Sequence, residues 1–183
     1  MAQILITRML RAARLDAALY EEVEADRTAM AQAMAVVLIS GLAAGVGGLL
    51  KTGPVSLLIG TGSAISGWLV WAGLTYLIGA KLFPEPDTKA DLGEMLRTIG
   101  FAGSPGVVRA FGVIPGLTEG VFVAASVWML AAMVVAVRQA LDYKSTARAV
   151  GVCVLGWLIQ ATVFLLLLRA QGIDPRALGQ LGS

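Results

Sequence analysis

Carboxylates are the side chains of this sequence best suited to acid–base chemistry, because histidine is absent. Without histidine the chain lacks the usual general base, the commonest metal ligand and the base of every Ser-His or Cys-His nucleophile pair. The 12 Asp and Glu residues fall almost wholly outside the long apolar stretches, so no two of them are expected to face one another at membrane depth. We therefore expect a non-enzymatic protein; the alternative is a carboxylate-dependent enzyme that uses Glu119.

The composition gives no indication of a metal site, a cofactor site or a nucleic-acid-binding surface. Cys153 is the only cysteine and lies inside an apolar stretch, where it can form neither a disulfide framework nor a thiolate metal site. The net charge is only +2, with Lys and Arg scattered along the chain, which does not describe a nucleic-acid surface. The sequence predicts no cofactor, no bound metal and no nucleic-acid partner.

Four polar side chains are candidates for contact with a lipid headgroup or a protein partner: Arg109, and at the last two apolar stretches Arg138, Asp142 and Gln160. Arg138 and Asp142 are spaced i, i+4 at a predicted helix end, which favours an interfacial ion pair and membrane anchor; the alternative is a lipid-headgroup or partner site. Gln160 lies in the middle of its stretch, so we expect it to bond to a neighbouring helix; the alternative is a polar path for a substrate.

The elements that carry these residues are helices in a lipid bilayer. Of the 183 residues, 57% are hydrophobic and 14% charged, whereas a soluble domain is about 25% charged. A spanning helix needs about 20 mostly apolar residues. Four stretches meet this requirement: residues 29–50, 55–80, 120–137 and 149–168.

A fifth apolar segment, residues 98–114, carries Arg109 and is broken by Ser104-Pro105-Gly106, before Pro115 ends it. Ser104 can cap a new helix that begins at Pro105. The 17 residues would extend about 25 Å as a helix, which crosses a bilayer with slight thinning, and Arg109 can then reach the far interface. A re-entrant dip is the alternative, with its corner at Ser104 buried against protein.

The turn before this segment has the pattern of an amphipathic helix. Asp91 and Glu94 fit a capping box. Apolar residues then recur at i, i+3, i+4 and i+7, which places Arg97 with the two acids on the opposite, polar face.

Small residues indicate where the first two spans pack together. Gly41 and Gly45 form a G-x-x-x-G pair, and Gly60 and Gly67 lie on one side of the second span. Such residues allow helix backbones to approach closely in lipid. We expect packing within one chain, with homo-oligomerisation as the alternative.

The two ends of the chain are more polar. Residues 1–28 are expected to form a cytoplasmic or interfacial helix with Leu15, Leu19 and Val23 along one side. This helix would rest on the membrane surface or, alternatively, offer a docking surface to a partner. Residues 169–183 are expected to be a short polar tail.

Four short motifs carry a resemblance to a known family. "YEEVEAD" at 20–26, "RTIGFAGSPG" at 97–106, "VIPGL" at 113–117 and "RQALDYKSTARAVGVCVLGW" at 138–157 resemble the bacterial branch of the Yip (Ypt-interacting protein) domain family. The resemblance implies five spans, a cytoplasmic N-terminus and no catalytic residues. Eukaryotic relatives bind Rab-type GTPases and shape endoplasmic reticulum and Golgi membranes. The sequence departs from these relatives in having no long cytoplasmic N-terminal region, which weakens the expectation of GTPase binding.

The predicted fold is an all-α, polytopic membrane bundle of five transmembrane helices with a broken third helix. We expect it in a bacterial inner membrane, acting in membrane organisation or as an assembly subunit. Its partners would be lipids and either another membrane protein or a second copy of itself. The alternative is a small-solute transporter, channel or lipid scramblase that uses the broken helix around Pro105, with Arg109 and Gln160 as its polar track.

Overall fold

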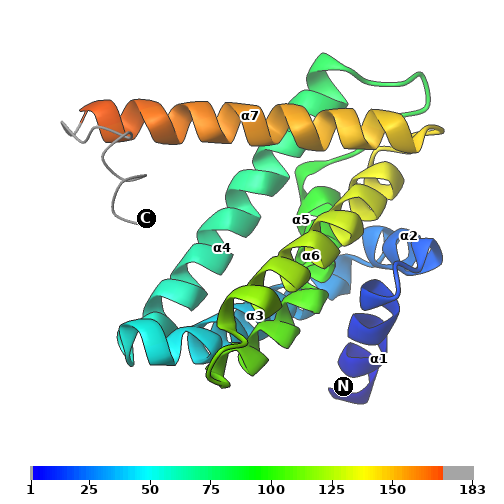
Figure 1. Cartoon of the computed structure of the whole chain (residues 1–183). Helices are drawn as coiled ribbons and strands as arrows, with labels where there is room; N and C mark the ends of the chain where they lie inside the picture. The colour runs from blue at the N-terminus through cyan, green and yellow to red at the C-terminus, as the bar shows by residue number, and fades with distance from the viewer. Residues whose placement is uncertain (1, 171–183) are drawn as a thin grey trace.

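The computed structural model describes residues 2–170, and in this part of the chain every regular element is a helix (Figure 1). Four helices are long and apolar enough to cross a membrane: Arg27–Thr52, Val55–Leu82, Thr118–Ala140 and Thr146–Val163. The prediction of an all-α helical membrane bundle is therefore confirmed. The elements in order are α1 (Ala2–Ala13), α2 (Ala17–Ala25), the 3₁₀ turn η1 (Arg27–Ala29), α3 (Met30–Thr52), α4 (Val55–Thr75), the π-helix η2 (Tyr76–Leu82), α5 (Leu92–Ala102), the 3₁₀ helix η3 (Ser104–Val113), α6 (Thr118–Ala140) and α7 (Thr146–Ala170).

The N-terminal segment is two helices, where the sequence pattern predicted one. The chain turns at Leu15, which has a left-handed φ of 62°, and the Asp16 side chain then accepts a hydrogen bond from Ala18 N to cap α2. Leu19 and Val23 are fully buried, because α2 packs against both α5 and α6. The predicted stripe through Leu15 was wrong, and α2 is part of the bundle core.

Close packing of α3 on α4 follows the small residues. A side chain added at Gly45 would place its Cβ 2.6 Å from Leu57 Cα, and one at Gly60 would place it 2.9 Å from Gly45 Cα. Gly41 is equally tight, with Thr61 Cα 2.9 Å away. These three glycines therefore serve close helix packing, as predicted. Gly67 does not, since no atom lies within 4 Å of a Cβ built there.

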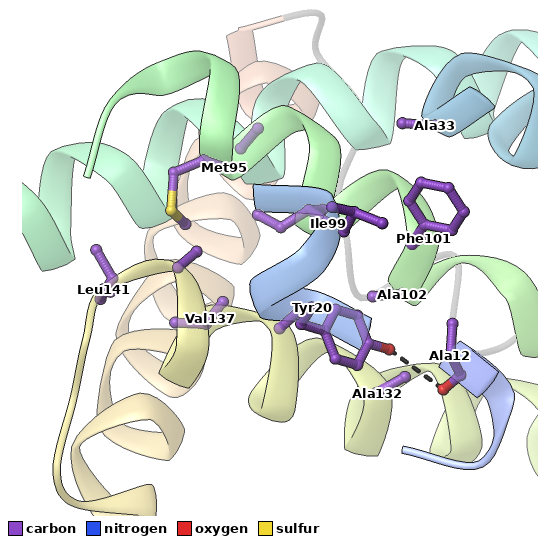
Figure 2. Packing of buried hydrophobic residues seen from close by; sticks show 14 of the residues in the cluster. Ala12, Tyr20, Ala33, Met95, Ile99, Phe101, Ala102, Ala132, Val137 and Leu141 are labelled. Atoms are coloured by element: carbon purple, nitrogen blue, oxygen red, sulfur yellow. Dashed lines mark hydrogen bonds between the residues drawn. The ribbon is translucent and has the colours of Figure 1, made fainter. Parts of the chain in front are cut away.

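The core of the bundle forms where α2, α5 and α6 meet (Figure 2). Met95, Ile99 and Phe101 of α5 lie among the buried side chains of the neighbouring helices. Tyr20 is fully buried, and its hydroxyl donates to Ala12 O at 3.2 Å, which joins α2 to the end of α1. The amphipathic helix predicted from residue 91 is thus correct in its apolar face. Its capping box is also present, with Asp91 Oδ1 2.8 Å from Glu94 N and Glu94 Oε2 2.7 Å from Asp91 N.

The broken segment α5–η3 runs alongside α3 for most of its length. A Cβ at Gly100 would meet Ala33, Ser40 Oγ donates to Gly103 O at 2.8 Å, and a Cβ at Gly112 would meet Gly47 Cα at 3.2 Å. The rise of α3 from Ala33 to Gly47 is about 21 Å. The segment therefore travels from one end of α3 toward the other and does not turn back at Ser104.

The turn between α3 and α4 lies beside the turn that leads into α6. Lys51 Nζ, beside the α3–α4 turn, lies 2.9 Å from Glu119 Oε1 at the start of α6. The chain reaches α6 through a turn in which Gly116 has a φ of 84°, directly after Pro115. The 3₁₀ helix of the broken segment ends at Val113, two residues before Pro115.

The last helix lies across the bundle (Figure 1). α7 contacts α4, η2 and α6, and Gly156 accommodates the Trp71 ring, which would be 3.1 Å from a Cβ at that position. The predicted span 149–168 falls within α7. Residues 171–183 of the predicted tail lie outside the described residues.

Candidate functional site

The helix break differs in detail from the sequence prediction. Ser104 does not cap a new helix, since its hydroxyl donates backward to Phe101 O at 2.7 Å. Pro105 stands near the start of a 3₁₀ helix, not an α-helix, and a 3₁₀ helix rises about 2 Å per residue. Ser104, Pro105 and Gly106 are all buried, with Gly106 in a space where a Cβ would lie 3.0 Å from Met129 Sδ. The break is therefore packed against α3 and α6.

Arg109 extends from η3 toward α6. One guanidinium nitrogen donates to Ser126 Oγ at 2.9 Å, and the guanidinium carbon lies 5.6 Å from the centre of the Phe122 ring. Its Nε is buried and has no hydrogen-bond partner among the described residues. This arginine is therefore a cation in apolar surroundings, held by one hydroxyl and one aromatic face.

Arg109 lines a cleft of about 550 Å³ between α3, α4, η3 and α6, which we name the central cleft. Its outline is marked by Ser40 of α3, Gly67 of α4, Met129 of α6 and Trp157 of α7. This location explains why no atom stands near Gly67, since that glycine faces the cleft and not a helix. Gln160 does not line the cleft, and no hydrogen bond joins it to another described residue. The structure therefore does not bring Arg109 and Gln160 together in one cavity.

The predicted ion pair between Arg138 and Asp142 is not formed. α6 ends at Ala140 and Asp142 takes a left-handed φ of 53°, so the two residues do not occupy successive turns of one helix. Arg138 donates instead to the carbonyls of Tyr143 at 3.2 Å and Lys144 at 3.4 Å. Its role is to hold the turn between α6 and α7.

An ion network joins α1 to α2 and the start of α3. Arg8 donates to Glu22 Oε1 at 2.9 Å, to Asp26 Oδ2 at 2.9 Å and to Gln32 Oε1 at 3.0 Å. Arg11 NH1 also lies 2.6 Å from Glu22 Oε2, and this guanidinium lowers the pKa of Glu22. The sequence pattern gave no signal for these contacts, because the partners of Arg8 lie beyond the turn at Leu15.

Arg97 is the largest departure from the predicted faces of α5. It was predicted on the polar face, yet the residue is only 6% exposed. Its Nε donates to Val23 O at 2.9 Å and another guanidinium nitrogen donates to Glu24 O. A cation that bonds the last carbonyls of a helix also interacts favourably with the helix dipole. Arg97 thus caps the C-terminal end of α2.

The carboxyl group of Glu24, near the C-terminal end of α2, has a shifted pKa. Its pKa is raised to about 7, chiefly by burial and in addition by the nearby carboxylates of Asp142, Glu94 and Glu21, against the opposing effect of Arg97. Among residues 2–170 no group of three or more metal-ligating side chains is arranged to hold a metal ion.

Residues 83–91 are fastened to the turn between α6 and α7. The Tyr143 hydroxyl lies 3.0 Å from Gly79 O and 2.8 Å from Phe83 O, and Thr88 Oγ1 donates to Leu141 O at 2.7 Å. Lys144 Nζ pairs with Asp87 at 2.8 Å. α2, residues 83–91 and residues 138–148 therefore gather at one end of the bundle, and we name this surface the polar end.

The comparisons with known proteins agree with this architecture. The family model described as the Yip1 domain matches residues 17–168, from the first residue of α2 into α7. Neither the curated proteins nor the solved structures compared with the chain include a match. The family match covers most of the sequence, including every element of the polar end, and the chain therefore belongs to the Yip1 domain family.

Proposed function

We propose that this protein acts without catalysis, as an assembly subunit or an organiser of its membrane, and that the polar end is the surface it offers to partners. The protein is an integral membrane protein with several apolar helices. Members of the Yip1 domain family are generally non-enzymatic trafficking proteins. The partner in this proposal is another membrane protein or a second copy of the chain.

The observation that carries the proposal is the fixed geometry of the polar end. Three segments far apart in the sequence are held there by buried contacts: Arg97 donates to the end of α2, and the hydroxyl of the buried Tyr143 lies 2.8 Å from Phe83 O, at the start of residues 83–91. Charged side chains such as Lys144, 77% exposed, remain on the outside of this framework. A preformed charged surface binds a partner with little ordering cost.

We further propose that the chain crosses the membrane five times, with the polar end in the cytoplasm of a bacterial cell. The support is the path of α5–η3, which begins beside α2 and ends beside Gly47, near the paired turns at Lys51 and Glu119. Basic residues favour the cytoplasmic side. Lys89, Lys144 and Arg148 all belong to the polar end.

Site-specific photo-crosslinking in native membranes tests the assembly role. A photo-reactive amino acid in place of the exposed Lys89 should give one defined protein adduct. The matched control is Leu58, 76% exposed on the apolar face of α4, where the same group should react with lipid. The Tyr143→Phe background should weaken the Lys89 adduct, because residues 83–91 lose their anchor. Absence of a protein adduct at Lys89, or an equal adduct at Leu58, would contradict the proposal.

A further inference from the structure

The central cleft has a mostly apolar lining. α4 and α6 supply two of its walls, and residues of α3 and Trp157 of α7 also line it. Along α4 the lining runs from Gly60 to Trp71, which is about 16 Å of helix. The volume of about 550 Å³ lies in the range of sites that hold small molecules.

The two ends of the central cleft differ in polarity. Arg109 and Ser126 lie at the end nearer the turns of Lys51 and Glu119, whereas Trp71 and Trp157 lie at the opposite end. The cleft thus has a cationic mouth followed by an apolar channel. This sequence of environments matches a molecule with an anionic group at one end and a hydrocarbon chain behind it.

Arg109 has no anionic partner among the described residues. Glu119, a carboxylate at that end of the bundle, is already paired with Lys51. Arg109 lies five residues before Ile114, which in a 3₁₀ helix is about 10 Å from the end of the segment. An arginine at this depth is costly unless it is paired or reaches the interface. One hydrogen bond to Ser126 satisfies only part of its five donors.

The surroundings of the cleft are lipid and not water. The outward side chains on the two helices that form its walls are large and apolar, including Leu58 at 76% exposed, Val123 at 64% and Val127 at 65%. A soluble anion would have to leave water to reach Arg109, whereas a phospholipid is already present in the membrane. A long arginine side chain near the end of a membrane-crossing segment can extend toward the phosphate groups of the lipids.

We propose that the central cleft binds an anionic phospholipid, with its phosphate held by Arg109 and one acyl chain lying between α4 and α6. This inference goes beyond the assembly role and stands independently of it. The lipid supplies the negative charge that the described residues do not, and its chain fills the space beside Gly67.

Native mass spectrometry of the full-length protein in mild detergent tests the site, with phosphatidylglycerol and phosphatidylcholine as the two probes. Wild type should bind phosphatidylglycerol about tenfold more tightly, because phosphatidylglycerol is a net anion, whereas the phosphate of phosphatidylcholine stands beside a trimethylammonium cation that Arg109 repels. Arg109→Gln should lose this preference, and Arg109→Lys should keep most of it.

A matched glycine pair tests the channel independently of the charge. Gly67 and Gly62 both have open space for a new side chain, but only Gly67 lines the cleft. Gly67→Leu should reduce binding of both probes about tenfold, whereas Gly62→Leu should bind as wild type does. If Arg109→Gln does not yield folded protein, this pair decides the question.

Three outcomes would overturn the proposal. The first is a phosphatidylglycerol preference that persists in Arg109→Gln. The second is equal binding by the Gly67→Leu and Gly62→Leu variants. The third is a lipid-free dimer that Gly67→Leu converts to monomer, because the cleft would then be occupied by a second copy of the chain.

Discussion

Replacing Arg97 with glutamine should loosen α2 from the bundle. The guanidinium is 6% exposed and donates to two carbonyls, those of Val23 and Glu24. Hydrogen bonds from a charged donor contribute about 1.5–3 kcal/mol each, and a neutral glutamine recovers part of this through one weaker bond and a smaller desolvation cost. The net loss should be about 3 kcal/mol, which raises the open population of α2 about 100-fold.

Hydrogen–deuterium exchange in detergent measures this opening directly. Backbone amides of Ala17–Ala25 should exchange about 100-fold faster in Arg97→Gln, while those in the middle of α6 change little. Arg27→Gln is the matched control, because Arg27 is exposed at the junction of α2 and α3. Unchanged exchange in α2 would refute the capping role of Arg97. An equal rise throughout the bundle would show that the effect is global and not a release of α2.

Three further predictions concern packing, pH and the anchoring tyrosine. Gly45→Ala should lower the unfolding free energy by about 1–3 kcal/mol, because its Cβ would lie 2.6 Å from a backbone carbon, whereas Gly67→Ala should leave the thermal midpoint unchanged. The folded-state pKa of Glu24 is raised to about 7 from its usual 4.5, so the folded state binds more protons and stability should fall as pH rises between these values. Glu24→Gln should remove this slope in thermal unfolding at pH 5 and pH 8; an unchanged slope would assign it to another group. Tyr143→Phe should cost about 1–2 kcal/mol and increase protease cleavage within residues 83–91, since the hydroxyl lies near the carbonyls of Gly79 and Phe83; wild-type cleavage rates would count against it.

The fold class was predictable because its causes are local. Lipid requires long apolar helices, and this requirement places four spans directly from composition. Gly41, Gly45 and Gly60 were also found from spacing alone, because only small residues allow two backbones to meet within the bilayer. Gly67 shares the same spacing rule, yet it borders the central cleft. Spacing identifies a helix face but does not say whether another helix covers it.

The contacts of Arg97, Arg8 and Arg138 could not be predicted, because each depends on elements from another part of the chain. The amphipathic pattern placed Arg97 on the polar face of α5, but α2 covers that face and supplies carbonyl acceptors. The i, i+4 spacing of Arg138 and Asp142 requires a continuous helix, and α6 ends between them. The 3₁₀ winding after Pro105 was missed for a similar reason, since tight packing against Gly47 and Met129 accompanies it.

The bond from Arg97 to the end of α2 also imposes an order on biosynthesis. The donor and its acceptor Val23 are separated by 74 residues. Translation adds about 5–20 residues per second, so Arg97 is synthesised roughly 4–15 seconds after Val23. Until then α1 and α2 lack the contact with Arg97. During that interval α3 and α4 can already be inserted, so the N-terminal helices join a partly assembled membrane domain instead of nucleating it.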